Sequence, residues 1–106
     1  VYRSTNRGTN WRSIAPATLD PAGGSVSAIA VSEFDNLTVA VGFSSGTIAI
    51  TRNPQATTPT WTVRQPRAGF VSSLTLDPLD GNRMFATYSN FGGAKVFRSR
   101  DGGQAW

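Results

Sequence analysis

The sequence predicts an all-β protein made of β-propeller blades, each with four antiparallel strands. Three observations lead to this fold class. An eight-residue pattern occurs near both ends of the chain, 95 residues apart. Short apolar runs bounded by turn-forming residues recur between the two copies, and their order repeats after 45 residues, whereas no segment shows the helical spacing i, i+3, i+4, i+7. Four strands in about 45–50 residues are typical of a propeller blade.

The first strands are expected at residues 1–4 and 11–15, on either side of the first copy of the pattern. A complete set of four strands is predicted next, at residues 26–31, 37–43, 47–51 and 60–64. Each of these runs is apolar or alternating and is bounded by Gly, Ser, Asn, Asp or Pro, which favour turns. We therefore expect residues 1–18 to supply strands C and D of a preceding blade, and residues 19–66 to form a complete blade.

The same order of runs then returns, with strands expected at residues 71–76, 83–88 and 95–98. Residues 67–106 are thus predicted to hold strands A to C of a further blade, ending in the second copy of the pattern. Residues 1–106 would cover about two blades of a larger propeller, because a propeller closes with four to eight blades. Because the chain starts without Met and within the pattern, we expect it to be an internal segment of a longer protein.

The repeated pattern reads S-x-[D/N]-x-G-x-x-W and joins strand C to strand D. Its residues are Ser4, Asn6, Gly8 and Trp11 in the first copy, Ser99, Asp101, Gly103 and Trp106 in the last, and Thr51, Asn53 and Trp61 in a degenerate middle copy. An Asp or Asn side chain can fold back onto backbone N–H groups of the turn. Glycine supplies a positive φ without steric cost, and tryptophan buries a large ring beside the sheet.

The pattern resembles the Asp-box, or BNR repeat, of sialidases, xyloglucan-degrading glycosidases, sortilin-type receptors and photosystem assembly factors. The resemblance implies a β-propeller in which the boxes lie on the rim away from the ligand face. The alternative is that Asp101 is a catalytic acid or a calcium ligand. A calcium loop needs several oxygen ligands, and Asn6 stands at the same position without a charge, so a structural role is favoured.

In a propeller the D-to-A and B-to-C connections share the face that usually carries the ligand. The candidate contacts on this face are Asp20, Arg64, Arg67, Asn90 and Phe91. Tyr88 also lies there, but it matches Phe43 of the previous blade, so we expect it to pack between blades. The other carboxylates fall in turns of the opposite face: Glu33, Asp35, Asp77, Asp80 and Asp101.

This composition excludes several chemistries for the segment. The chain has no Cys and no His, which removes thiolate and imidazole ligands and the commonest general base. Most glycosidases need two carboxylates roughly 5–10 Å apart, and the predicted ligand face has only Asp20. A sialidase would need an arginine cluster with a Tyr and a Glu, of which Arg64 and Arg67 could form part. We predict no catalytic residue, no metal and no cofactor in this segment.

The leading hypothesis is a segment of an extracellular or cell-surface/periplasmic Asp-box propeller that acts as a binding or interaction scaffold for a carbohydrate or protein. One alternative is part of a glycoside hydrolase of the sialidase or xyloglucanase type, with its catalytic residues outside these 106 residues. Another is a two-blade unit whose copies assemble into a ring. The expected partners are the remaining blades or other copies. The scattered net charge of +4 does not indicate nucleic-acid binding, and no 18-residue apolar run predicts a membrane span.

Overall fold

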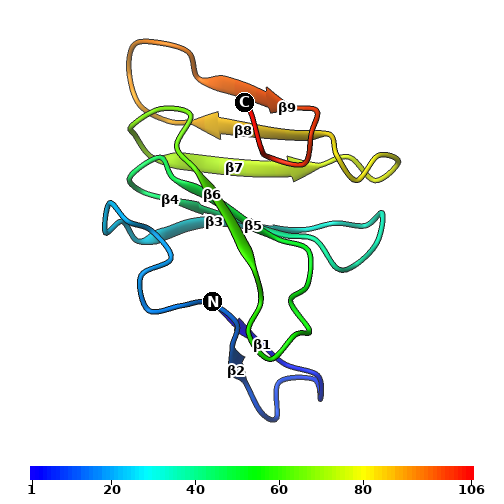
Figure 1. Cartoon of the computed structure of the whole chain (residues 1–106). Coiled ribbons are helices and arrows are strands. Elements are labelled where there is room, and N and C mark those ends of the chain that lie inside the picture. Colours follow the sequence, from blue (N-terminus) through cyan, green and yellow to red (C-terminus); the bar gives the residue numbers. More distant parts are fainter.

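Nine strands form three antiparallel sheets in the computed structural model, which describes residues 1–106 and contains no helix (Figure 1). The strands are β1 (Tyr2–Arg3), β2 (Arg12–Ser13), β3 (Val26–Val31), β4 (Val39–Phe43), β5 (Ile48–Thr51), β6 (Trp61–Arg64), β7 (Val71–Leu76), β8 (Met84–Tyr88) and β9 (Val96–Ser99). The predicted all-β class and the antiparallel pairing are confirmed.

Each sheet is a meander in which consecutive strands pair. The orders are β1-β2, β3-β4-β5-β6 and β7-β8-β9, and none of the sheets is closed. The strand boundaries differ from the prediction at several ends. β2 covers only Arg12–Ser13 of the expected residues 11–15, and β4 begins at Val39 rather than at residue 37. For β4 the cause can be seen in the preceding turn: the Asp35 carboxylate accepts the backbone N–H groups of Leu37 and Thr38, at 2.9 and 3.0 Å, and holds both in the turn.

The four-stranded and three-stranded sheets share one register. β3 pairs with β4 through a bulge between Val26 and Ala28, and β7 pairs with β8 through a bulge between Val71 and Ser73. These two bulges lie 45 residues apart in the sequence, at the same place in each sheet. The repeat read from the sequence is therefore a repeat of hydrogen-bonding register as well as of strand order.

Strand β4 is buried on both faces because the four-stranded sheet has a core cluster on each side. One cluster joins it to the three-stranded sheet; its buried members are Ala40, Ile48, Ile50, Val71, Leu74, Met84, Ala86 and Tyr88. The other faces the N-terminal segment and contains Leu19, Val39, Val41, Phe43 and Ala49. The alternation of β4 residues between these clusters follows from the two-residue period of a strand.

The two larger sheets approach each other closely at Gly42. β7 lies beside β3 and β4 (Figure 1). A Cβ atom built on Gly42 would stand 2.5 Å from Cγ1 of Val71, closer than real side-chain atoms pack. Gly42 is thus needed in this strand for contact between sheets, although glycine otherwise weakens a strand.

Candidate functional site

Four connections meet at one end of the strands, which we call the loop end. They are the β2–β3 connection, the β4–β5 turn, the β6–β7 connection and the β8–β9 loop. Backbone hydrogen bonds join each to its neighbour: Ser44 N–H to Ser25 O at 2.8 Å, Gly69 N–H to Ser45 O at 3.1 Å, and Ser89 N–H to Phe70 O at 3.1 Å. The loops predicted to share the ligand face therefore form one connected surface.

Asp20 lies inside this network and is buried, with 7 % of its surface exposed. Oδ1 accepts the Thr47 hydroxyl at 2.7 Å and the Ala22 N–H at 2.9 Å. Oδ2 accepts the Ser45 hydroxyl at 2.6 Å and the Gly24 N–H at 2.7 Å. Burial raises the pKa of Asp20, but these four hydrogen bonds outweigh it and hold the pKa below its ordinary value. The carboxylate pins the β2–β3 connection to the β4–β5 turn, so its oxygens are occupied within the fold.

Arg67 links the β6–β7 connection to the β8–β9 loop. Its Nη1 donates to the carbonyls of Gly92 and Ala94, both at 2.9 Å, and its guanidinium carbon lies 5.7 Å from the centre of the Tyr88 ring. Tyr88 is buried and donates its hydroxyl to Gly46 O at 2.8 Å. Burial raises the pKa of Tyr88 to about 12.

Asn90 and Phe91 have different surroundings although they are adjacent. Asn90 Oδ1 accepts the backbone N–H of Phe70, which ties the base of the β8–β9 loop to the start of β7. Phe91 stands at the tip of the loop with 98 % of its surface exposed. The Lys95 ammonium lies 5.9 Å from the centre of its ring, within the range of a cation–π contact.

Arg64 does not join the other candidates. Its Nε and Nη2 donate to the backbone oxygen and Oε1 of Gln104, at 3.0 and 3.1 Å, and its Nη1 donates to Val63 O. The side chain thus connects β6 to the last turn of the chain. Of the five predicted ligand contacts, Arg64, Asn90 and Phe91 are exposed, but the side chains of Arg64 and Asn90 are held by hydrogen bonds within the fold. Lys95 is not predicted, because a single cation in a glycine-rich loop carries no pattern.

The three copies of the repeated pattern share one hydrogen-bonded turn. In each, the hydroxyl donates to the Asn or Asp Oδ1: Ser4 to Asn6 at 3.0 Å, Thr51 to Asn53 at 2.9 Å, and Ser99 to Asp101 at 2.9 Å. The same Oδ1 accepts the N–H of the residue before the tryptophan, which is Asn10, Thr60 or Ala105, at 2.8, 2.9 and 3.0 Å. We call this arrangement the Oδ1 clamp.

The glycines complete the turn in the two full copies. The N–H groups of Gly8 and Gly103 donate to the hydroxyls of Ser4 and Ser99, both at 2.8 Å. Their φ angles are 87° and 89°, a region that favours glycine. The middle copy has no glycine and lacks this hydrogen bond, yet keeps the Oδ1 clamp across a longer loop.

The three tryptophans are not equally buried. Trp61 and Trp106 are partly buried against the two core clusters, and the Trp61 indole N–H donates to Ile14 O at 2.9 Å. Trp11 is 63 % exposed, so the expectation that it buries its ring is wrong for this copy. The physical reason is that β1 and β2 form a sheet of only two strands, which offers no core for the ring to cover.

The Oδ1 clamp predicts how Asp101 responds to substitution. Asp101→Asn is expected to leave the midpoint of thermal unfolding nearly unchanged, because Asn6 makes the same two contacts in the first copy. Asp101→Ala is expected to lower the midpoint, because the Ala105 N–H and the Ser99 hydroxyl lose their acceptor; these two donors also hold the pKa of Asp101 below its ordinary value. Tryptophan fluorescence during heating measures both, and equal losses in the two variants would contradict the clamp.

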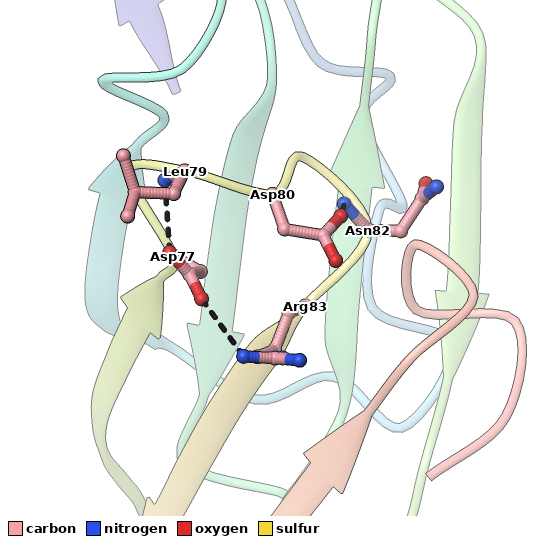
Figure 2. Close-up of polar contacts among 5 residues, drawn as sticks. All are labelled: Asp77, Leu79, Asp80, Asn82 and Arg83. Carbon is pink, nitrogen blue, oxygen red and sulfur yellow. Dashed lines mark hydrogen bonds and ion pairs between the residues drawn. The ribbon is translucent and has the colours of Figure 1, made fainter.

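The opposite end of the strands carries the exposed carboxylates. Figure 2 shows the β7–β8 turn, where Asp77 accepts the Leu79 N–H at 2.8 Å and forms an ion pair with Arg83 at 3.4 Å. Asp80 accepts the Asn82 N–H at 3.0 Å in the same turn. The carboxylates stabilise their own turns, and no group of three or more His, Cys, Asp or Glu residues could hold a metal ion.

A groove of ≈ 490 Å³ lies between the β2–β3 connection, the β5–β6 loop and β6. Its walls include Ile14, Leu19, Trp61 and Val63, together with hydroxyl and proline side chains, and none of the residues that line it is ionisable. It therefore holds no general acid or base. At the loop end, the one carboxylate, Asp20, and the one tyrosine, Tyr88, are both buried.

The chain was compared with protein-family models, with curated proteins and with solved structures, and none of the three comparisons found a match. The structure also has no helix that could cross a membrane.

Proposed function

We propose that this chain forms about two blades of an Asp-box β-propeller and acts as an extracellular or cell-surface binding scaffold. Support for the blades comes from the meander sheets, their shared register, and the Oδ1 clamp that recurs in all three copies of the pattern. Support for a scaffold comes from the loop end, where the one carboxylate, Asp20, and the one tyrosine, Tyr88, are both buried and so are not accessible to a substrate.

The proposed binding function rests on the exposure of Phe91. An aromatic ring that is 98 % exposed is costly to leave in water and is available to stack on the C–H face of a sugar ring. Its loop is held in place, because Arg67 fixes the carbonyls of Gly92 and Ala94 directly after the ring. A fixed anchor loses less conformational entropy on binding than a mobile one.

The charges around Phe91 favour an acidic carbohydrate. Lys95 is exposed beside the ring, and Arg67 lies on the same loop end. No exposed carboxylate accompanies them, because Asp20 is buried and the others lie in turns at the opposite end or in the boxes. A sugar carboxylate or sulfate would pair with Lys95 while the ring stacks on Phe91.

Phe91→Ala is expected to abolish binding of the chain to acidic oligosaccharides on a glycan array that carries both neutral and acidic sugars. Loss of a central aromatic anchor typically costs about 2 kcal/mol or more of binding free energy. Thermal unfolding should be unchanged, because the Phe91 ring contacts solvent almost entirely.

Leu79→Ala is the matched control for this experiment. Leu79 is also a large apolar side chain at a turn, 86 % exposed, but it lies in the β7–β8 turn at the opposite end (Figure 2). Its removal should leave sugar binding intact. Binding that is lost equally in both variants, or no binding by the unmodified chain to any sugar, would overturn the proposed ligand.

A further inference from the structure

The β1–β2 hairpin places two arginines directly opposite each other. Arg3 pairs with Arg12 in the register of the two strands. Residues paired in this way share one face of the sheet, and like charges there are destabilising. The corresponding pair in the four-stranded sheet is Ile50 with Thr62, and neither of these residues is charged. The repeated structure therefore does not require a charge at either position, and the two arginines need a reason of their own.

No acidic residue in this part of the chain balances the two charges. Residues 1–19 contain three arginines and no Asp or Glu, and the one ion pair of the chain joins Asp77 to Arg83 in the β7–β8 turn. The repeated pattern also lacks its acid here, because Asn6 stands where the last copy has Asp101. The hairpin is therefore left with uncompensated positive charge.

Both arginines line a hollow of ≈ 330 Å³ between the hairpin and the β5–β6 loop, which lies beside it (Figure 1). The remaining lining residues are uncharged: Thr5, Asn10, Trp11 and Gln55. The hollow thus combines two cations with neutral polar groups and one aromatic ring. Such a lining attracts an anion and offers no negative charge to repel it.

The guanidinium groups keep hydrogen-bond donors free for a ligand. Nη2 of Arg12 donates to the carbonyls of Pro54 and Ala56, at 3.3 and 3.1 Å, which fixes this side chain against the β5–β6 loop. Its Nε and Nη1 make no hydrogen bond within the chain. Arg3 is half-buried, and its guanidinium has no acceptor in the fold. A positioned arginine with free donors is well suited to bind an oxyanion through two parallel hydrogen bonds.

Trp11 supplies an aromatic surface at the same hollow. Its ring is 63 % exposed, whereas the equivalent Trp61 and Trp106 pack against the two core clusters. The ring is positioned by the turn, since a Cβ atom built on Gly8 would lie 3.6 Å from its Cζ2. A ring carried by a bound anion could stack on the exposed indole.

We propose that this hollow binds the phosphate monoester of a ring-bearing ligand, such as a sugar or aryl phosphate. A phosphate monoester carries nearly two negative charges at neutral pH, so it compensates both Arg3 and Arg12. A sulfate ester or a carboxylate carries one charge and would leave one arginine unbalanced. The hollow shares no residue with the loop end around Phe91, so this inference can fail independently of the proposed function.

Titration of the 106-residue chain with phenyl phosphate, followed by NMR of its N–H groups, tests the site. The indole N–H signal of Trp11 and the Nε–H signals of Arg3 and Arg12 are expected to shift together and to saturate. Arg3→Gln is expected to weaken binding about tenfold or more, because it removes a charge-assisted hydrogen bond. Without ligand, the same variant should unfold at an unchanged or higher temperature, because it relieves the repulsion between the arginines.

Arg98→Gln is the matched control, because Arg98 stands 95 residues after Arg3, at the same place relative to the repeated pattern. It removes the same charge from the chain but lies on β9, outside the hollow. Phenyl phosphate should bind this variant as tightly as the unmodified chain. Equal weakening by the two substitutions, or shifts that do not saturate, would overturn the proposal.

Phenyl sulfate tests the requirement for two charges, because it carries the same ring with only one. It is expected to bind about tenfold more weakly at neutral pH. Lowering the pH through about 6, where a phosphate monoester gains a proton, should weaken phenyl phosphate and leave phenyl sulfate unchanged. Equal affinities for the two compounds would overturn the assignment of a phosphate. Phe91→Ala should leave phenyl phosphate binding intact, which separates this site from the proposed sugar site.

Discussion

Gly46→Ala is expected to lower the free energy of unfolding by about 3 kcal/mol or more. Gly46 has a φ of 98°, which L-residues rarely adopt, and a Cβ atom there would overlap the carbonyl oxygen of Arg67. The obstacle is backbone, so no side-chain rotation relieves it. The shift would also disturb Gly46 O, which accepts the buried Tyr88 hydroxyl at 2.8 Å.

Urea unfolding followed by tryptophan fluorescence measures this loss, and Gly23→Ala separates its two causes. Gly23 also has a positive φ, 75°, but a Cβ atom added there would have no other atom within 4 Å. The Gly23→Ala variant should therefore lose only the free energy needed to hold an alanine at a positive φ, about 1 kcal/mol. Equal losses at the two positions would show that the contact between the β4–β5 turn and the β6–β7 connection contributes nothing.

Asp20→Asn is expected to cost about 2–3 kcal/mol at neutral pH, although the two side chains have the same shape. The amide NH2 would stand where Oδ2 accepts the Gly24 N–H and the Ser45 hydroxyl, so a donor would face donors. Asp80→Asn is the control: Asp80 is exposed and accepts only the Asn82 N–H, which an amide oxygen also accepts. It should be nearly neutral.

The pH dependence gives a second measurement on Asp20. Because the folded-state pKa of Asp20 is lowered, the unfolded chain binds the proton more tightly. The stability contributed by this carboxylate is therefore present above the pKa of the unfolded state and is lost as pH falls through the folded pKa. Urea midpoints measured from neutral pH down into the acid range should fall less steeply for Asp20→Asn than for the unmodified chain. Parallel curves would contradict the assignment.

The strand order could be predicted from the sequence because each strand is a short apolar run enclosed by turn residues. β3 and β7 occupy the predicted residues without change. The same local information predicts the turns of the repeated pattern, since every partner of Asn6 or Asp101 lies within four residues along the chain.

The roles of the loop-end residues could not be predicted in this way. The sequence position of Asp20 suggests a ligand contact, but its hydroxyl partners Ser45 and Thr47 lie 25 and 27 residues away, and only the folded chain brings them together. Arg64 follows β6 and is expected on the same face for that reason, yet its long side chain reaches Gln104 instead. Phe91 lies at a loop tip between turn-forming residues. Its exposure could be predicted, because the side chain has no partner far away in the sequence.

The Oδ1 clamp has a consequence for how the chain tolerates insertions. In the middle copy Asn53 reaches the Thr60 N–H across seven residues, whereas Asn6 and Asp101 span four. The clamp fixes only the two ends of the turn, so the residues between them can vary in number at a small closure cost. A foreign peptide or reporter loop could therefore be inserted into these turns. The β4–β5 turn is unsuited to such an insertion, because its glycine, Gly46, is buried.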